Sequence, residues 1–317
     1  MQYGSLEGQR GTAGARAIRG RDANAQSPGN QRPVIWARIS GNDASMGFAQ
    51  SWLGGIVGYD VALAMTFALL LPLELALPRP ESSVSLRSRL QAVVFWLAWV
   101  PVTVAVMLFA GALWRALDIR PLLTTLAPGF LPGPVGVVVG ALAAAFVGDF
   151  FYYWCHRAQH RFLWRFHAVH HSVRELSGMS AYHHISEEAI KVLLYALPLG
   201  LFIDDPLGIP VLGVILGVQG HYLHSTTRLN LGPLGRIIQD NRFHRIHHSM
   251  RTEHFDKNFG VFTTVWDSVF GTAHFPGREE WPPTGLADEP EPQSIADFYF
   301  RPFLPQKAPS TVTSAIG

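Results

Sequence analysis

The chain has 317 residues, of which 48% are hydrophobic and only 15% are charged. This length fits one large domain or two small ones, and the low charge content indicates a membrane protein. A net charge of +2, with no basic stripe interleaved with aromatic residues, argues against nucleic acid as a partner. The single cysteine, Cys155, cannot form an internal disulfide or a cysteine-rich metal site, so imidazole must bind any metal.

The first 46 residues are rich in Gly, Ala, Arg, Ser and Asn and show almost no apolar periodicity. We expect residues 1–46 to form a disordered, Arg-rich tail. Two interpretations stay open: a segment like a transit peptide, or a true start at Met46, directly before the first apolar segment.

Three apolar segments are each long enough to cross the roughly 30 Å hydrocarbon core of a bilayer. They run from Leu53 to Pro78, from Leu90 to Trp114 and from Pro134 to Trp154. A fourth, from Ile190 to Gly220, is divided at Asp204–Pro206 into pieces that are short for full spans. We therefore expect a re-entrant or tilted helical hairpin there.

All fourteen histidines lie between His156 and His274, and most fall into three clusters. The patterns are H-x-x-x-H at 156–160 and H-x-x-H-H at both 167–171 and 244–248. On a helix, positions i, i+3 and i+4 share one face, so each cluster directs its imidazoles to one point. The eight clustered imidazoles exceed the four ligands of a tetrahedral ion, which favours two metal ions held close together.

Acidic residues near the clusters extend the candidate site. Asp149 shares a helix face with His156 and His160, and it is placed to accept the free N–H of a metal-bound imidazole. His184 and Glu187 are spaced i and i+3, so either could join the coordination sphere.

The remaining histidines carry weaker signals. His183 faces elsewhere than His184, and we expect it either beside the ligands, without binding a metal itself, or at the surface. His224 is the better ligand candidate of its pair, and His221 is either a ligand or a core histidine at the interface. His254 and His274 are isolated in the sequence and are not assigned to the site.

The charges between the first two spans predict the topology. Arg79, Arg87 and Arg89 lie in this loop, which the positive-inside rule assigns to the cytoplasm. The second span leaves the cytoplasm and the third returns to it. The histidines that follow the third span therefore emerge on the cytoplasmic face.

The region from about Asp149 to Thr272 resembles the membrane-bound fatty acid hydroxylase and sterol desaturase superfamily. The three histidine boxes carry this resemblance, together with the stretch 178–187, the stretch that begins at His224, N-F-G at 258–260 and W-D-x-x-F-G-T at 266–272. Ile185 stands where the family usually has Pro.

The resemblance implies an all-α, multi-pass membrane bundle capped by a cytoplasmic, histidine-lined site for two metal ions. These ions are usually iron, with zinc as the alternative in isolated protein. Carried over by position, the implied ligands are His156, His160, His167, His170, His171, His184, His224, His244, His247 and His248. The implied hydrogen-bond partners of these ligands are Asp149 and Asp267. The alternative role for Asp267 is to cap or brace a helix. We place Glu187 and His221 in the same outer layer.

Imidazole suits Fe, Cu, Zn and Ni, so the ligand type does not select the metal. A redox-active pair beside a bilayer suits O2-dependent hydroxylation, desaturation or ether cleavage of a sterol, fatty acyl chain or related lipid. The sequence has no G-x-G-x-x-G fingerprint and no haem-attachment motif, so electrons must come from a separate reductase, ferredoxin or cytochrome b5-like protein.

Two other functions are weighed against this hypothesis. A zinc-dependent membrane hydrolase would use metal-bound water, but no H-E-x-x-H motif is present and Glu187 is the only obvious base. A metal transporter would place its histidines inside the spans, whereas here they follow the span ends.

The predicted organisation is a tail over 1–46, transmembrane helices over 47–148, a catalytic region over 149–272 and an irregular, Pro-rich tail over 273–317. Amphipathic helical pieces are expected around 232–250 and 260–270.

Overall fold

The computed structural model describes residues 44–118, 133–202, 208–287 and 289–304. The predictions for residues 1–43, for the break at Asp204–Pro206 and for residues 305–317 lie outside these ranges. Contacts divide the chain into residues 1–47 and 48–317, and the fold is that of the second unit. Helices and isolated β-bridges make up the described part, which contains no extended strand. The all-α prediction is therefore confirmed for these ranges.

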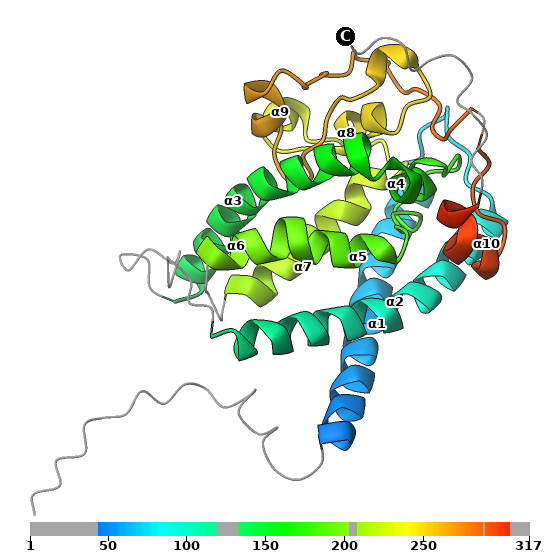
Figure 1. The fold of residues 1–317 in the computed structure, drawn as a ribbon. Helices are drawn as coiled ribbons and strands as arrows, with labels where there is room; N and C mark the ends of the chain where they lie inside the picture. The colour runs from blue at the N-terminus through cyan, green and yellow to red at the C-terminus, as the bar shows by residue number, and fades with distance from the viewer. Residues whose placement is uncertain (1–43, 119–132, 203–207, 288, 305–317) are drawn as a thin grey trace, which may run out of the picture. The chain divides into compact units, whose positions relative to one another are not determined.

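Three long apolar helices dominate the fold (Figure 1). They are α1 (Ala44–Ala76), α2 (Leu86–Ala116) and α3 (Gly133–Phe162). All three are long and apolar enough to cross a membrane. At 1.5 Å per residue, thirty helical residues extend about 45 Å, which exceeds a hydrocarbon core of roughly 30 Å. The chain is an integral membrane protein with three candidate spans among its described residues.

Helix α3 continues beyond the predicted end of the third span at Trp154 and reaches Phe162. One unbroken helix therefore carries both the apolar segment and the histidines at 156 and 160. The first histidine pair is positioned directly by a membrane-length helix rather than by a loop.

Two helical arms follow and pack against α3. The first arm consists of α5 (Ser186–Lys191), a π-helical turn (Val192–Ala196) and α6 (Leu197–Phe202). The second arm is α7 (Gly208–His224). These arms correspond to the predicted hairpin, and the first begins four residues earlier than expected.

Small residues let the elements around α3 approach closely. Ala141, Ala144 and Ala145 are buried against Leu212 of α7 and against Phe262. A Cβ added at Gly148 would lie 3.3 Å from the Tyr195 hydroxyl. Helix pairs in membranes commonly use such small residues at their contacts.

Shorter elements form a cap over one end of this bundle (Figure 1). They include α4 (Trp164–His171), a 3-10 turn (Gly232–Arg236), α8 (Asn241–His247), a 3-10 turn (Thr252–His254) and α9 (Val265–Val269). The helical pieces expected around 232–250 and 260–270 are thus present in shorter form. Asp240 begins α8 by accepting the N–H groups of Arg242 and Phe243, as an N-cap residue does.

The C-terminal segment is less irregular than predicted. It contains α10 (Ile295–Phe300) and a 3-10 turn (Arg301–Phe303). Phe298 is fully buried and stacks on Phe95 of α2 at 4.8 Å between ring centroids. The prediction of irregular structure does not hold for residues 295–303. Ser294 begins α10 by accepting the Asp297 N–H, and burial of Phe298 against α2 stabilises the helix.

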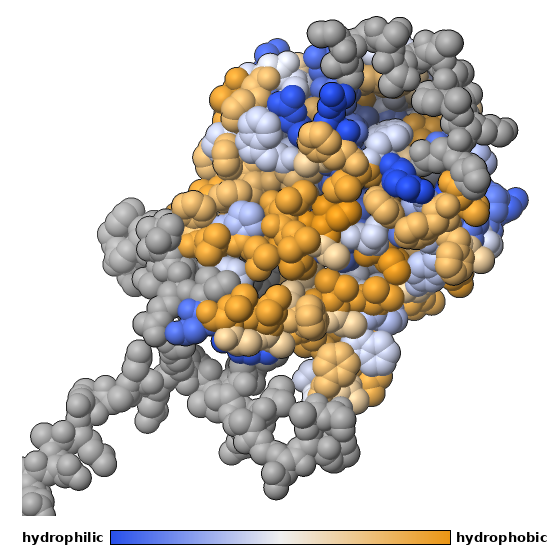
Figure 2. Space-filling model, viewed as in Figure 1, coloured by the Kyte–Doolittle hydropathy of each residue, from blue (hydrophilic) through white to orange (hydrophobic). Residues whose placement is uncertain are grey.

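Apolar side chains extend over the surface of α2, α5 and α6 (Figure 2). On α1, Leu53, Val57, Val61, Met65 and Leu69 are all exposed and follow one another at intervals of four residues. An exposed apolar stripe of this length is typical of a surface that contacts lipid.

The buried carboxylate of Glu74, near the end of α1, joins the bundle to the cap. Its Oε1 accepts the N–H groups of Gly178, at 2.7 Å, and Thr226, at 3.0 Å. Its Oε2 accepts from the Arg89 guanidinium of α2 at 2.7 Å. One side chain therefore connects two membrane-length helices to the loops on either side of the two arms.

Replacement of Glu74 by Ala should lower the free energy of unfolding by about 3 kcal/mol, because it leaves a buried guanidinium and two N–H groups without their acceptor. Chemical or thermal unfolding in detergent measures this loss. Glu81→Ala, at an exposed position in the following loop, is the matched control. Equal stability of the two variants would contradict the role given to Glu74.

Candidate metal centre

Nine buried or half-buried imidazoles form two adjoining groups at the end of the bundle. The first group contains His156, His160, His167, His171 and His247. The second contains His170, His224, His244 and His248. Within each group the candidate ligand atoms all lie within 4.8 Å of one another. The structure thus brings together nine of the ten residues implied as ligands.

The H-x-x-H-H pattern explains how one short helix serves both groups. On α4, His167 and His171 face the first group while His170 faces the second. On α8 the assignment is reversed, since His244 and His248 face the second group. Residues four apart differ by only about 40° around a helix, whereas a residue three apart is offset by about 60° to the other side. The i, i+4 pair therefore approaches one ion and the i+3 residue approaches its neighbour.

Backbone carbonyls fix the outer nitrogen of several rings. The Nδ1 atoms of His156, His170, His224 and His247 lie 2.6–2.9 Å from the carbonyl oxygens of Phe259, Tyr182, Gly220 and Lys257, respectively. A carbonyl oxygen can only accept, so Nδ1 carries the proton in each case. In a neutral ring, Nε2 then carries no proton, and its lone pair is available to bind a metal ion.

These Nε2 atoms point toward one another. The Nε2 atoms of His156 and His167 are 2.9 Å apart, and those of His170 and His224 are 3.2 Å apart. His247 Nε2 is buried without a hydrogen-bond partner. Lone pairs that face each other at this distance repel unless a cation lies between them. The donor set therefore fits transition-metal ions bound through Nε2.

Burial keeps the rings on the two cap helices neutral. The histidine pKa is lowered well below its ordinary value of 6.5, first by burial and then by neighbouring imidazoles. This holds for His167, His170, His171, His244, His247 and His248. Because metals bind the neutral ring, these side chains need not release a proton at neutral pH.

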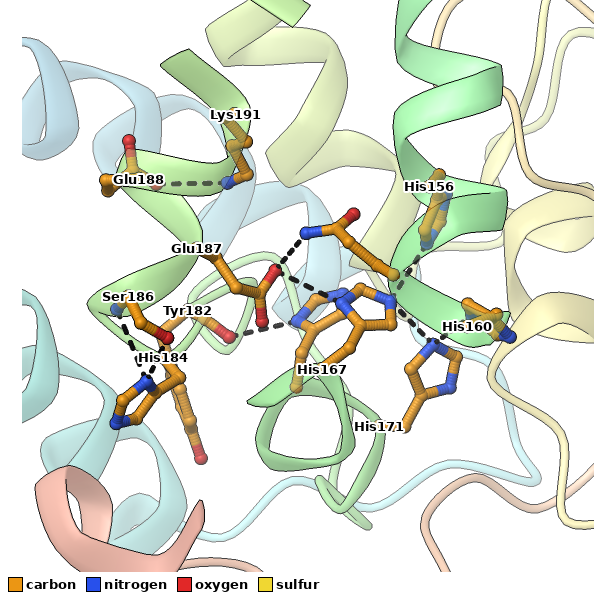
Figure 3. A network of polar contacts seen from close by, with 12 residues as sticks. His156, His160, His167, His171, Tyr182, His184, Ser186, Glu187, Glu188 and Lys191 are labelled. Carbon is orange, nitrogen blue, oxygen red and sulfur yellow. Dashed lines mark hydrogen bonds and ion pairs between the residues drawn. The ribbon is translucent and has the colours of Figure 1, made fainter. Parts of the chain in front are cut away.

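Glu187 lies beside the first group (Figure 3). Its Oε2 accepts from the Gln159 amide at 2.7 Å and lies 3.1 Å from His167 Nδ1. Burial raises the pKa of this carboxyl to about 8. A carboxyl group in this position orients the ring and directs its Nε2 atom toward the other imidazoles.

The two aspartates hold a loop instead of an imidazole. Asp149 accepts the N–H groups of residues 261–263 at 2.8–3.0 Å and the Thr263 hydroxyl at 2.9 Å. The prediction that Asp149 binds a ligand ring is therefore wrong. Asp267 accepts from the N–H groups of Phe259 and Gly260. It braces the loop whose Phe259 carbonyl orients His156, so it acts on the site indirectly.

A carboxylate that sequence reasoning missed, Asp256, contacts the first group directly. Its Oδ1 lies 3.4 Å from His160 Nδ1, and the hydrogen bond to that ring holds the pKa of Asp256 below its usual value. Asp256 has φ 56°, in the left-handed region, and Asn258 has φ 59°. The turn that presents this carboxylate depends on tertiary contacts, so no local signal could have identified it.

His184 is the one implied ligand that the structure places elsewhere. Its Nδ1 lies 2.7 Å from the Ser186 hydroxyl (Figure 3). Its Nε2 lies 3.0 Å from the Tyr299 carbonyl. His183 instead stacks on His170 at 3.8 Å and lies within reach of His167 and Glu187. His184, an implied ligand, therefore lies outside both groups, whereas His183 lies beside the ligands, which is one of its two expected places. Helix α5 begins only at Ser186, so helical spacing does not apply to them.

His221 belongs to the aromatic core near the centre. Its Nδ1 donates to the Gly178 carbonyl at 2.7 Å, and its ring packs against Phe67 and Trp96. The alternatives for His221 were a metal ligand and a core histidine. In the structure it is a core histidine and belongs to neither imidazole group.

The fold and the site together define a multi-pass helical membrane protein with a buried, polyhistidine centre. Residues 141–272 match the fatty acid hydroxylase family. This matched region contains all nine imidazoles of the two groups, so the similarity to the fatty acid hydroxylase family extends over the candidate metal centre.

Three relatives carry informative names. Ornithine lipid hydroxylase OlsE of Rhizobium tropici is 34% identical over 155 residues, which are 48% of this chain and 45% of that protein. Human alkylglycerol monooxygenase is 33% identical over 41% of this chain and 29% of its own length. Very-long-chain aldehyde decarbonylase GL1-4 of Oryza sativa is 28% identical over 43% of this chain and 24% of its own length. The matches cover less than half of each relative, and no solved structure matches the chain.

Replacement of His244 by Ala should lower the affinity for one metal ion by about 10–100-fold or more, because the second group then has three imidazoles instead of four. His184→Ala is the control and should retain metal like the unmodified chain, since this ring contacts Ser186 and Tyr299. Metal content after dialysis against a graded series of chelators measures both effects. Equal metal loss in the two variants would contradict the grouping.

Removal of the metal should make stability strongly dependent on pH. The unfolded chain takes up protons at histidine near pH 6.5, whereas the folded rings with lowered pKa do not. The metal-free fold should therefore lose stability as pH falls through 6.5, by about 1.4 kcal/mol per pH unit for each such ring. Thermal unfolding of metal-stripped protein checks this, and an unfolding temperature that is constant from about pH 7 to pH 5 would contradict it.

Proposed function

We propose that this chain is a membrane-bound oxygenase that uses two metal ions, natively iron, to oxidise a C–H bond of a lipid with O2. The observation that carries the proposal is the presence of two adjoining groups of buried imidazoles whose unprotonated nitrogens face each other. The names of the relatives, which include a hydroxylase and a monooxygenase, support oxygen chemistry.

In this proposal each imidazole group holds one ion, and residues 149–272 form the catalytic region attached to membrane helices within 47–148. A bound redox-active pair would activate O2, which is the oxidant: one oxygen atom enters the lipid and the other leaves as water, with two electrons from the separate donor. The protein orients the rings through carbonyls such as that of Phe259 and through the Glu187 carboxyl. Burial excludes water, which protects an oxidising site from side reactions.

The position of the centre supports a lipid substrate. His156 and His160 lie near the end of α3, and His224 ends α7, so the ligands continue directly from apolar helices. A substrate dissolved in the bilayer could approach the centre along these helices without crossing water. The relatives' names contain an ornithine lipid, an alkylglycerol and a very-long-chain aldehyde. We propose an amphiphile with a long alkyl or acyl chain, and hydroxylation as the reaction.

Contacts of the α1–α2 loop support a cytoplasmic location of the centre. The Arg79 N–H donates to the Thr226 carbonyl at 2.9 Å, just after α7, and the Arg87 guanidinium donates to Gln293 at 3.0 Å. The Arg-rich loop thus lies on the same side as the histidine-bearing helix ends. Since arginine-rich loops stay in the cytoplasm, we place the centre there and propose a separate cytoplasmic or membrane-bound electron donor.

The test compares the unmodified chain with His170→Ala in reconstituted membranes supplied with iron, a reductant system and candidate lipids. We expect O2 consumption to be matched by formation of an oxidised lipid, and His170→Ala to reduce turnover by at least about 100-fold. His184→Ala is the control and should retain turnover.

Mass spectrometry after incubation with ¹⁸O2 identifies the product. Incorporation of ¹⁸O into the lipid supports hydroxylation, whereas release of a cleaved lipid without O2 consumption would overturn the proposal in favour of hydrolysis. Full activity of His170→Ala would overturn the assignment of the second imidazole group.

A further inference from the structure

Two histidines that are isolated in the sequence come together with a glutamate on the cap. The candidate ligand atoms of His254, His274 and Glu280 all lie within 4.8 Å of one another. His254 Nε2 lies 3.0 Å from Glu280 Oε1, and His274 Nε2 lies 3.4 Å from Glu280 Oε2. None of the three belongs to either imidazole group.

The donor set and its spacing fit zinc. Two imidazoles and one carboxylate form a known three-residue set for this ion, which leaves one position for water. In a tetrahedral site with bonds of about 2.0–2.2 Å, neighbouring ligand atoms lie roughly 3.3–3.6 Å apart. The observed separations of 3.0 and 3.4 Å are close to this value, so only small side-chain movements would admit an ion.

Surrounding hydrogen bonds hold the three side chains in place. His254 Nδ1 lies 2.9 Å from the Ser249 hydroxyl, which leaves Nε2 directed at Glu280. The Gly277 N–H donates to Glu280 Oε2 at 2.8 Å. The backbone N–H of His274 donates to Asn258 Oδ1 at 2.7 Å. Outer contacts of this kind orient ligands before an ion arrives.

One of the three side chains is buried and two are partly exposed to solvent, so an ion can reach the cluster from one side. The His254 side chain is almost fully buried, at 1% exposure, whereas His274 and Glu280 are 33% and 21% exposed. Solvent therefore reaches one side of the cluster and can supply the remaining ligand. The buried side is anchored to the turn that follows α8.

We propose that His254, His274 and Glu280 form a third metal site, which binds zinc with a water molecule as the fourth ligand. The site would link the 252–254 turn to the segment 274–280, which follows the loop braced by Asp267. Because α8 and its C-cap residue carry three of the imidazoles, a zinc ion here would stabilise the end of that helix from outside the main centre. The site does not depend on the proposed oxygenase activity.

The experiment counts zinc in the full-length chain purified in detergent. Metal-stripped protein is equilibrated with Zn²⁺, passed through a desalting column and analysed for zinc per chain. The test variants are Glu280→Gln, which keeps the side-chain shape, and His274→Ala. The matched control is Glu279→Gln, at the neighbouring position, where the side chain is 81% exposed.

We expect the unmodified chain and Glu279→Gln to bind one more zinc ion per chain than Glu280→Gln and His274→Ala do. Equal zinc counts in all four proteins would overturn the proposal. The difference is independent of the main centre, because a chain that bound nothing at the two imidazole groups would still show it.

A second measurement guards against misfolded variants. Zinc should raise the thermal unfolding midpoint of Glu279→Gln more than that of Glu280→Gln, since an ion bound only to the folded state stabilises it. An identical zinc-dependent shift in both variants would also overturn the proposal.

Discussion

The structure depends on one constraint: nine neutral imidazoles converge in a space largely closed to water, with unprotonated nitrogens directed inward. Without cations, facing lone pairs and lost hydration would make such a cluster unfavourable. The rest of the cap can be understood as the framework that holds these rings despite this cost. Helix spacing divides them into two groups, and backbone carbonyls at Nδ1 fix the direction of four of them, His156, His170, His224 and His247.

The framework has two layers that come from distant parts of the chain. Carbonyls of the loop after α8 contact the rings, as Lys257 does with His247 and Phe259 does with His156. Behind that loop, Asp149 and Asp267 accept its N–H groups. These two aspartates therefore act on the rings indirectly, by fixing the backbone whose carbonyls bind them, whereas Glu187 and Asp256 contact rings directly.

The same cap connects the centre to the membrane helices. Glu74 joins α1 and α2 to the loops beside α5 and α7, while Phe298 packs the C-terminal segment onto α2. Small residues on α3 let α7 approach closely, which brings His224 to the rings of α4 and α8. The buried imidazoles thus continue directly from apolar, membrane-length helices, because the ends of α3 and α7 carry His156, His160 and His224.

The features that could be predicted from the sequence are those set by the thickness of a bilayer or by the geometry of a single helix. Apolar length predicted the three long helices, and i, i+3, i+4 spacing identified the eight histidines of the three clusters, because both follow from fixed helical geometry. The ninth converging histidine, His224, lies outside these clusters. In the irregular segments, the directions of the side chains became known only from the tertiary structure. It turned His183 toward the centre and His184 away, placed Asp256 at His160, and gathered His254, His274 and Glu280. In such segments, side-chain direction is set by contacts with residues far along the chain, and no local period encodes it.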